Sequence, residues 1–474
     1  MSKYMARKLL DSEIKKLHQQ MHMHLLEPLL KVIDAAGGRT FLVGGAVRDF
    51  LLNVSLKDLD MEVHGLDLMQ LKKILAKFGQ VNEVGKSFGV LKFRIAVDQP
   101  EIDFSLPRMD SAGRKPKVEI DPEMTIEKAL RRRDITMNAM AIDLIAHELH
   151  DPFCGEQDMY KKVLRCPDKD LFAEDPLRFY RVMQFVGRFE MEPDEQLNNI
   201  CKTMDIAHVS RERVEEEMKK LMLKSKEPSR GLRWIFKIGR MQEIFPELAV
   251  LVTTVQSSVH HPEGDVFEHT MQVVDAAATL RNQLDNDYDK LVLMYGALCH
   301  DVGKATTTVL YSEGKVTSYN HEVVGVDIAK TLLSRFCGNK DLIATVKKLV
   351  RYHMQPAQLV KGNAHVSAYK RLAVKLSPET HCHMLALLCI ADKRGRGLEH
   401  KPLNEPDELV EEFLKTVERA DIGDEPEPPI LLGRDFLDIC KPGPQLGELV
   451  KKAYKIQIDE GIKDPQELKA RALS

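Results

Sequence analysis

The first apolar residues of the chain recur at helical spacing. They are Ile14, Leu17, Met21, Leu25 and Leu29. Gly37 and Gly38 follow this run, and glycine commonly ends a helix because it tolerates a left-handed backbone. The pattern therefore predicts an amphipathic N-terminal helix within residues 1–36.

The pattern changes after residue 37. Short apolar runs with β-branched and aromatic residues predict one helix at 68–78 and strands at 40–43, 59–63, 90–97 and 102–104. From about residue 124 onward, nearly every apolar pattern has a helical period. We therefore expect an α+β fold, with a small α/β head at residues 37–150 followed by a mostly α-helical body.

Proline-rich and polar stretches divide the helical part. One boundary lies near residues 245–264, and the stretch 421–429 (DIGDEPEPP) is acidic and rich in proline, as linkers are. The segments expected after the head are a helical body, a second helical domain, a linker and a short C-terminal module, at residues 151–250, 257–400, 401–429 and 430–474.

Composition excludes several classes of protein. The chain has 43% hydrophobic and 30% charged residues and contains no run of eighteen apolar residues, which excludes a membrane-spanning protein. Its formal net charge of -3 excludes a generally basic nucleic-acid wrapper, so any RNA contact must come from local patches. Asp11 and Glu13 interrupt the start before any secretory core, and the eight cysteines lack CxxC spacing. We expect a cytoplasmic protein.

Carboxylates in the head predict a metal site. Asp58 and Asp60 are two apart on a predicted strand and so share a face, where they repel each other unless a cation lies between them. Oxygen ligands of this kind suit Mg²⁺, and Asp103 is the best-placed third carboxylate. Gly44 and Gly45 form a tight turn whose bare amides can approach a triphosphate. Taken alone, two aspartates at this spacing more often lie on a solvated strand face.

A second group of ligands lies in the second helical domain. Adjacent histidine and aspartate within an apolar helix are costly to bury unless a partner such as a metal satisfies them. Imidazoles and carboxylates from separate helices suit a divalent transition metal, here with the ligands His269, His300, Asp301 and Asp392. His321 and His353 could add a second metal position, contact a substrate phosphate, or be ordinary helix histidines. His381-Cys382-His383 has metal-like spacing but is isolated in a helical run, so we favour a structural role for it.

Five ordered motifs identify the first part of the chain. GGAVRD (44–49), KDLDMEV (57–63), RRDITMNA (132–139), DPF (151–153) and EDPLR (174–178) resemble those of the class II CCA-adding enzymes and the related bacterial poly(A) polymerases. The resemblance covers roughly residues 38–220. It implies template-independent addition of CCA to the 3′ end of tRNA from CTP and ATP, with Mg²⁺ in the head. It also implies catalytic roles for Asp58, Asp60 and Asp103 and nucleotide contacts from Gly44, Gly45, Arg48, Arg132, Arg133, Asn138, Asp175 and Arg178.

The last of these motifs has a chemistry of its own. Asp175 and Arg178 share a helix face, and a carboxylate with a guanidinium can pair with the Watson-Crick edge of a base. A surface salt bridge is the alternative explanation.

Residues 110–116 lie where the resembled family has a flexible loop that helps switch from C to A addition. Ser210 is predicted to cap a helix.

The order H…HD…D over about residues 257–400, with His261-Pro262-Glu263 before it, resembles the HD phosphohydrolase domain fused to bacterial CCA-adding enzymes. That resemblance implies a metal-dependent phosphatase and 2′,3′-cyclic phosphodiesterase. A poly(A) polymerase or A-only enzyme, and an inactive RNA- or nucleotide-binding protein, are the alternative interpretations of the whole chain. The sequence leaves open the oligomeric state, the metal of the HD domain, and the roles of the N-terminal helix and the C-terminal module.

Overall fold

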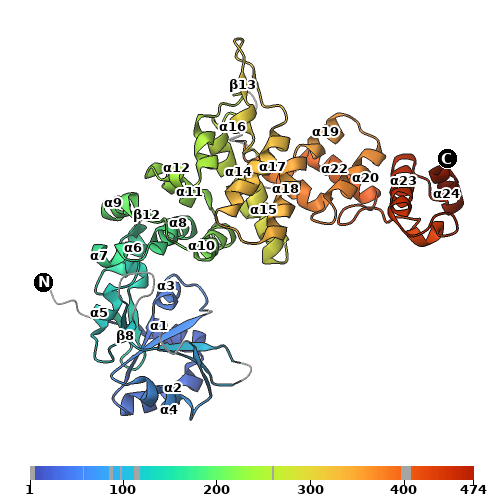
Figure 1. Cartoon of the computed structure of the whole chain (residues 1–474). Helices are drawn as coiled ribbons and strands as arrows, with labels where there is room; N and C mark the ends of the chain where they lie inside the picture. The colour runs from blue at the N-terminus through green and yellow to red at the C-terminus, as the bar shows by residue number, and fades with distance from the viewer. Residues whose placement is uncertain are drawn as a thin grey trace. The chain divides into compact units, whose positions relative to one another are not determined.

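The computed structural model describes residues 6–56, 58–84, 89–96, 99–110, 118–258, 261–396 and 407–474. The chain forms two compact units, residues 1–209 and 210–474, which are described separately below (Figure 1). The loop expected at residues 110–116 falls almost wholly outside the described residues.

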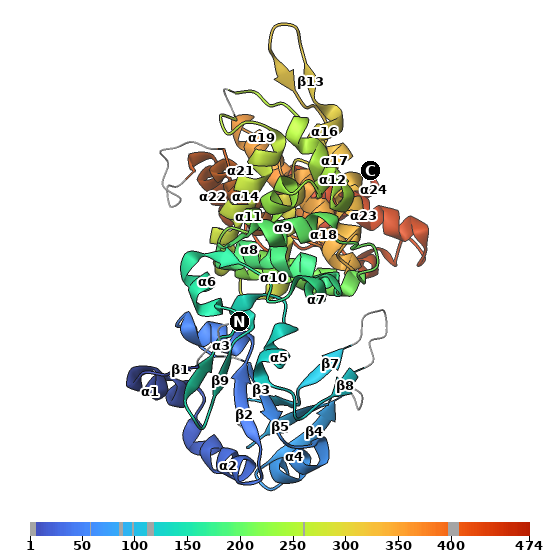
Figure 2. The same cartoon turned by 90° about the vertical axis from the view of Figure 1, so that its left-hand side faces the viewer.

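The first unit contains one mixed sheet of eight strands (Figure 2). Strands β3 and β6 pair in parallel, and the other neighbours in the sheet are antiparallel. Helices α2 and α4 pack against each other at one end of this head. In sheet order the strands are β1 (Arg7–Lys8), β10 (Glu148–His150), β9 (Ala141–Asp143), β2 (Arg39–Val43), β3 (Leu59–His64), β6 (Ile102–Ser105), β5 (Val90–Arg94) and β4 (Gln80–Val84).

The predicted strands are present, and the α+β class is confirmed. The expectation of helix from about residue 124 was wrong at β9 and β10, which join the sheet beside β2. Both strands have only three residues, and all three residues of β9 are buried, so no alternation of polar and apolar positions could reveal them. A further short pair, β7 (Arg108–Asp110) with β8 (Val118–Ile120), also went unpredicted.

The N-terminal apolar pattern forms two helices instead of one. Helix α1 (Asp11–Gln20) and helix α2 (Met23–Ala35) are separated at His22, whose φ of 49° is left-handed and interrupts the helical backbone. Strand β1 precedes them and pairs with β10, so the first residues described belong to the head sheet.

The rest of the first unit is mainly helical. Its longest helix is α8, which is buried along most of its length. Besides β7 to β10, the elements after β6 are, in chain order, α5 (Ile126–Arg131), η1 (Thr136–Asn138), α6 (Gly155–Lys161), β11 (Val163–Leu164), α7 (Lys169–Ala173), α8 (Leu177–Phe189), β12 (Glu192–Pro193) and α9 (Glu195–Thr203). Between β2 and β4 lie α3 (Gly45–Leu51) and α4 (Leu68–Leu75).

In the second unit, the described residues form helices and one short hairpin. The unit begins with α10 (Arg211–Lys224), capped at Ser210 as predicted, although the serine side chain makes no capping hydrogen bond. Helices α11 (Ser229–Lys237), α12 (Met241–Ile244), α13 (Pro246–Ala249) and η2 (Val250–Thr253) follow. Five helices then pack together in the yellow and orange part of Figure 1: α14 (Val266–Leu280), α15 (Asp287–Cys299), α17 (His321–Ser334), α18 (Lys340–Tyr352) and α21 (Cys382–Arg394).

Smaller elements complete this unit. They are η3 (Arg281–Gln283), α16 (Lys304–Thr307), the hairpin β13 (Val309–Leu310) and β14 (Val316–Thr317), α19 (Gln355–Lys361), α20 (Val366–Leu376), α22 (Glu408–Arg419), η4 (Gly433–Phe436), α23 (Pro444–Glu460) and α24 (Pro465–Leu473). The C-terminal helices have a small core of their own around Phe436, Ala453 and Leu468.

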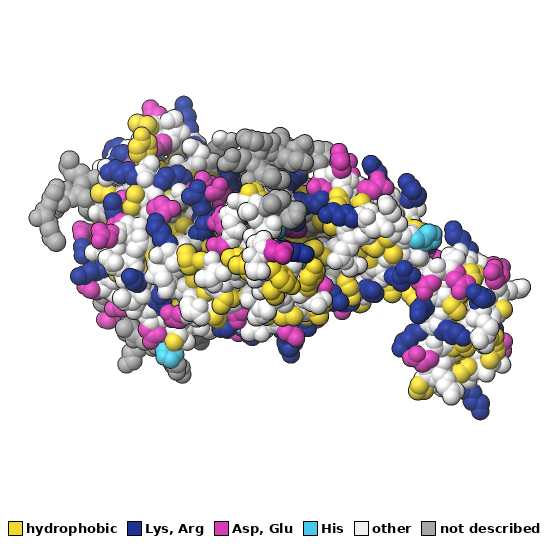
Figure 3. Space-filling view, turned by 90° about the horizontal axis from the view of Figure 1, so that it is seen from above, with side chains coloured by type: hydrophobic (Ala, Val, Ile, Leu, Met, Phe, Trp, Pro, Cys, Tyr) yellow, Lys and Arg dark blue, Asp and Glu magenta, His cyan; other side chains and the backbone are white. Residues whose placement is uncertain are grey.

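Surface charge agrees with the nearly balanced composition. Basic and acidic side chains are interspersed on the face shown in Figure 3. Among the described helices, none combines the length and hydropathy that a membrane crossing requires.

Candidate functional site

The carboxylates of the head meet across two parallel strands. In the register of β3 and β6, Asp60 lies directly opposite Asp103. Asp58 precedes Asp60 by two residues, and Lys92 on the next strand, β5, lies opposite Asp103 with Nζ 3.9 Å from Oδ1. The structure therefore brings the predicted pair of strands together and adds a lysine that the sequence analysis did not single out.

The surroundings of Asp60 shift the pKa of its carboxyl. Partial loss of water around Asp60 raises the pKa of its carboxyl, Arg133 lowers it, and the charges of Asp103 and Asp58 raise it further. A divalent cation among the three carboxylates would remove this repulsion, and oxygen ligands of this kind fit Mg²⁺.

The glycine turn lies beside an arginine of the predicted site. Gly44 has φ 70°, in the left-handed region, and caps α3. A Cβ atom at Gly44 would lie 2.5 Å from Nη1 of Arg133, so any side chain there would displace the guanidinium. Because Arg133 also acts on the pKa of Asp60, the turn and the carboxylates belong to one site.

Two further predicted residues, Arg48 and Asn138, are bonded to each other inside the head. Arg48 is buried, and its Nη1 donates to Oδ1 of Asn138 at 2.6 Å. Asn138 in turn donates to Asp134 at 3.0 Å, and Arg181 donates to the other oxygen of Asp134 at 2.6 Å. Asp134 and Arg181 are absent from the predicted set, although Asp134 lies within the RRDITMNA motif.

The EDPLR motif forms the start of α8. Asp175 accepts from the backbone N–H of Leu177 at 3.1 Å, which ties its carboxylate to the first turn. Arg178 donates to the carbonyl of Leu171 at 2.8 Å and to the carbonyl of Arg132 at 2.5 Å. The structure thus joins Arg178 to Arg132, another residue of the predicted nucleotide set.

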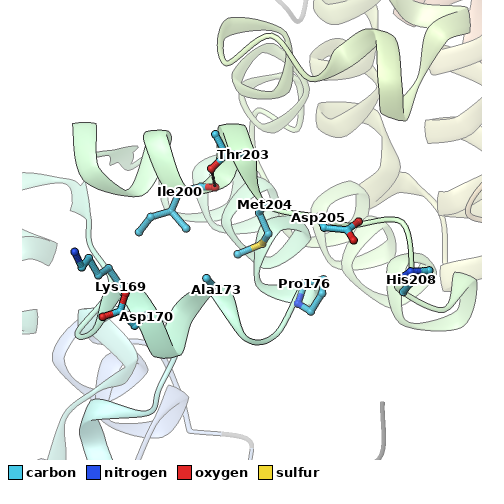
Figure 4. Close-up of a pocket in the computed structure, with 9 residues that line it drawn as sticks. All are labelled: Lys169, Asp170, Ala173, Pro176, Ile200, Thr203, Met204, Asp205 and His208. Atoms are coloured by element: carbon cyan, nitrogen blue, oxygen red, sulfur yellow. Dashed lines mark hydrogen bonds between the residues drawn. The ribbon is translucent and has the colours of Figure 1, made fainter. Parts of the chain in front are cut away.

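A cavity of about 540 Å³ lies close to this motif in the chain (Figure 4). It opens between α7 and α9 and is lined by Lys169, Asp170, Ala173, Pro176, Ile200, Thr203, Met204, Asp205 and His208. None of the predicted site residues lines it, so it does not coincide with the candidate nucleotide site.

The predicted ligands of the second unit converge tightly. The Nε2 atoms of His269 and His300 are 3.3 Å apart. Oδ2 of Asp301 is 3.2 Å from the His300 Nε2, and Oδ1 of Asp392 is 3.2 Å from the His269 Nε2. Helices α14 and α21 and the end of α15 supply these side chains. Four residues separated by up to 123 positions therefore form one cluster.

His321 and His353 lie on the other side of Asp301. Oδ1 of Asp301 is 3.2 Å from the His321 Nε2 and 3.7 Å from the His353 Nε2, and the two imidazole nitrogens are 3.2 Å apart. Since Oδ2 faces His300, the two oxygens of Asp301 face two separate groups of ligands. This is the geometry of a carboxylate able to bridge two metal positions.

Backbone carbonyls orient these imidazoles. The Nδ1 atoms of His300, His321 and His353 lie 2.9, 2.7 and 2.8 Å from the carbonyls of Ala297, Ser318 and Val350. A neutral imidazole whose Nδ1–H donates in this way presents Nε2 as the ligand atom. The fold therefore sets the tautomers that metal binding requires.

His269 is oriented by a carboxylate as well as by the carbonyl of Gly395, which lies 3.2 Å from its Nδ1. Its Nδ1 is 2.7 Å from Oε1 of Glu263, whose side chain is fully buried and also accepts from His261 at 2.9 Å. Glu263 is absent from the predicted ligand set, although the His261-Pro262-Glu263 motif was visible in the sequence. Lys304, with Nζ 2.7 Å from Asp301 Oδ2, and Arg396, with Nη2 3.0 Å from Asp392 Oδ2, were also missed.

The charges in this cluster stabilise one another. Burial opposes ionisation of Asp301, but Lys304 and His300 outweigh it and hold the pKa of Asp301 well below its ordinary range. Burial lowers the pKa of His353 to about 3, so this imidazole is neutral at pH 7. Burial also opposes the charged form of His269, but hydrogen bonds to Asp392 and Glu263 outweigh it and raise the pKa of His269 to about 9. A metal at its Nε2 would displace a proton.

This cluster opens into a cavity of about 520 Å³. Its lining combines ligand side chains with cations, among them Asp301, His321, His353, Asp392, Lys304 and Arg396. Carboxylates and imidazoles fit a divalent transition metal, and the adjacent cations fit a phosphate.

Three segments of the chain match known families. Residues 40–165 match the poly A polymerase head domain, residues 189–251 the probable RNA and SrmB-binding site of polymerase A, and residues 266–396 the HD domain. Asp58, Asp60 and Asp103 lie within the first segment and His269, His300, Asp301 and Asp392 within the HD segment, whereas Asp175 and Arg178 lie between matched segments.

Solved structures of CCA-adding enzymes share the fold. The Thermotoga maritima CCA-adding enzyme complexed with tRNA superposes with a TM-score of 0.62 at 18% identity, covering 99% of both chains. The Bacillus stearothermophilus enzyme in complex with CTP gives a TM-score of 0.63 at 16% identity, covering 96% of this chain and 97% of that one.

Sequence relatives are more similar. The multifunctional CCA protein of Pasteurella multocida is 32% identical over 371 residues, which is 76% of this chain and 84% of that protein. The multifunctional CCA protein of Nitrosococcus oceani is 32% identical over 386 residues, covering 78% and 88%. At this identity and coverage, the chain belongs to the multifunctional CCA proteins, class II CCA-adding enzymes that carry an HD domain.

Proposed function

We propose that this protein adds C, C and A to the 3′ end of tRNA, using CTP and ATP, and that its HD domain hydrolyses phosphate esters and 2′,3′-cyclic phosphates. The observation that carries the proposal is the in-register pair of Asp60 and Asp103, with Asp58 beside it, in a head whose glycine turn accommodates Arg133. Family membership supports the same activity.

In the head, Asp58, Asp60 and Asp103 hold Mg²⁺. When bound, this ion would activate the tRNA 3′ hydroxyl and stabilise the negative charge of the leaving diphosphate. The backbone amides of Gly44 and Gly45 contact the triphosphate, and Arg133 supplies positive charge next to them. Arg48 and Asn138 position this region through their shared hydrogen bond and contact the sugar side of the nucleotide.

Selection of the base is assigned to Asp175 and Arg178. The bonds from Arg178 to the carbonyls of Leu171 and Arg132 hold the plane of its guanidinium in one orientation. A fixed donor plane beside a fixed carboxylate can distinguish the hydrogen-bonding edge of C or A from that of G or U without a template strand.

In the HD domain, His269, His300, Asp301 and Asp392 hold a divalent transition metal. This ion supplies a nucleophilic water at neutral pH. Asp301 also faces His321 and His353, which hold a second ion, while Lys304 and Arg396 contact the substrate phosphate. Glu263 orients His269 toward the metal. All eight cysteines are free thiols, which fits a cytoplasmic location.

Incubation with tRNA lacking its 3′ CCA, Mg²⁺ and labelled CTP and ATP tests the first activity. We expect incorporation of C, C and A that stops after three nucleotides. A long A tail, or addition of A only to tRNA that already ends in CC, would instead identify a poly(A) polymerase or an A-only enzyme. No incorporation by the folded protein would contradict the proposal.

A further inference from the structure

Three side chains outside both candidate sites converge at the start of α21. His381 and His383 flank the first residue of this helix, and Asp424 lies in the segment that follows α22. Oδ1 of Asp424 is 2.8 Å from Nδ1 of His383 and 3.4 Å from Nδ1 of His381. One ligand atom from each of the three residues lies within 4.8 Å of the other two.

The local structure explains why these residues meet. His381 has an extended backbone (φ −144°, ψ 172°) and precedes the helix, while Cys382 between the histidines is buried. With the cysteine turned inward, both imidazoles remain partly exposed, at 31% and 39%. The two rings lie at 82° to each other.

The segment that carries Asp424 is bound to the helix start. The backbone N–H of His383 donates to the carbonyl of Gly423 at 3.2 Å. A Cβ atom at Gly423 would lie 2.2 Å from Cε1 of His383, so the imidazole packs directly on the glycine backbone. Asp421, two residues before Gly423, has a left-handed φ of 53° and turns the chain there. These contacts place Asp424 beside both histidines.

We propose that His381, His383 and Asp424 form a separate binding site for Zn²⁺ or a similar divalent transition metal. Bonds of about 2.0–2.1 Å in a tetrahedral site place ligand atoms roughly 3.3 Å apart. The two distances from Asp424 Oδ1, 2.8 and 3.4 Å, lie close to that separation. The backbone N–H of Met384 also donates to Nδ1 of His381 at 3.4 Å, so a metal at this nitrogen would replace the helix-capping hydrogen bond. The charge of Asp289 also acts on His381 and adds negative potential that favours a cation.

The role of this site is structural. A metal there would cross-link the first turn of α21 to the chain that leads to α23 and α24. The last turn of the same helix carries the HD ligand Asp392. Asp424 is 75% exposed, so a fourth ligand position is open to water. The inference is independent of the proposed catalytic functions, which use other residues.

Metal binding by the whole 474-residue chain tests this inference. The HD site is weakened by Asp301→Ala, the head is saturated with millimolar Mg²⁺, and Zn²⁺ binding is followed by calorimetry and by metal content after dialysis. His269, His300 and Asp392 remain in this background, so we expect the Asp424→Asn variant to bind one Zn²⁺ fewer per chain than its Asp301→Ala parent. Asp424→Asn should weaken Zn²⁺ binding at this site by at least about 100-fold, since loss of even an outer-shell partner costs 10- to 100-fold. Co²⁺ at this site should give a tetrahedral absorption spectrum.

Asp438→Asn is the matched control. Asp438 is an exposed aspartate of the same C-terminal region, paired with Lys469 instead of histidines. This variant should bind Zn²⁺ as its parent does. The inference is overturned if Asp424→Asn and the control bind Zn²⁺ equally, or if the Asp301→Ala parent binds none while remaining folded by circular dichroism. Asp424→Asn in an otherwise unmodified chain should leave nucleotide addition and phosphodiester hydrolysis unchanged.

Discussion

In the head, Asp60 and Asp103 meet across two parallel strands at the surface, whereas in the HD domain Asp301 and Asp392 are buried among helices. Burial, together with the charges of Asp103 and Asp58, raises the pKa of Asp60, whereas neighbouring cations outweigh burial and hold the pKa values of Asp301 and Asp392 well below their ordinary range. The head carboxylates are thus under electrostatic strain without a cation, while the HD carboxylates are already compensated.

The difference follows from the substrates proposed for the two sites. A site that receives both a nucleotide and the end of a tRNA must stay open, so it depends on ions and substrate to neutralise its charge. A site for a small phosphodiester can instead be built from side chains that the fold orients in advance. Metal binding at the HD site should therefore depend more strongly on residues that hydrogen-bond to its ligands, such as Glu263.

Asp60→Asn is expected to produce the largest difference between the effects on the two activities. Loss of a carboxylate that holds Mg²⁺ should reduce nucleotide addition on the order of 10³-fold, because metal charge stabilisation is worth several kcal/mol. Hydrolysis of a 2′,3′-cyclic phosphate should be unchanged in the same preparation. Parallel loss of both activities in a folded variant would mean that the sites are not separate.

Asp301→Asn should give the reverse pattern. Asp301 faces both groups of histidines, so its loss should reduce phosphodiester hydrolysis on the order of 10³-fold. CCA addition to truncated tRNA should continue at the unmodified rate. Retention of phosphodiesterase activity would remove Asp301 from the metal site.

Glu263→Gln tests the importance of residues behind the ligands. The amide keeps the shape of the side chain but weakens the bond that orients His269, so metal affinity of the HD site should fall about 10- to 100-fold. Competition with a chelator measures this affinity independently of activity. Glu247→Gln, which alters a carboxylate paired with Arg335, is the control and should retain the affinity. Equal affinities in the two variants would exclude the orienting role.

The smallest effect on either activity is expected at Asp275, a carboxylate of α14 that lies outside both candidate sites and acts on stability. Burial raises the pKa of Asp275 from the ordinary 3.8 to about 6, despite hydrogen bonds from Ser229. The folded state therefore disfavours its ionised form, and the stabilisation present below about pH 4 is lost as the pH rises through about 6.

Asp275→Asn should remove this pH-dependent loss of stability, which corresponds to about 3 kcal/mol in the free energy of unfolding. Urea unfolding of both proteins between about pH 4 and pH 7 measures it. The two free energies of unfolding should differ more in favour of the variant as the pH rises. A difference that does not change with pH would show that Asp275 does not titrate in this range.

Much of the fold could be predicted because its signals are local. The strands that carry Asp60 and Asp103 and the predominantly helical second part were visible in the periodicity. The break at His22 and strands β9 and β10 were not, because one left-handed residue and two three-residue strands leave no periodic signal. The family resemblance read from the motifs is confirmed by relatives that are 32% identical.

The order of residues along the chain determined which chemistry is available: carboxylates two apart on a strand, a glycine pair, and histidine next to aspartate at the end of an apolar helix. Only the tertiary structure decided which of these groups meet. It placed Asp103 opposite Asp60, turned the two oxygens of Asp301 toward different histidines, and brought Glu263 to His269 and Asp424 to His383. Local sequence patterns reach only a few residues along the chain, whereas these contacts depend on packing between segments that lie far apart in it.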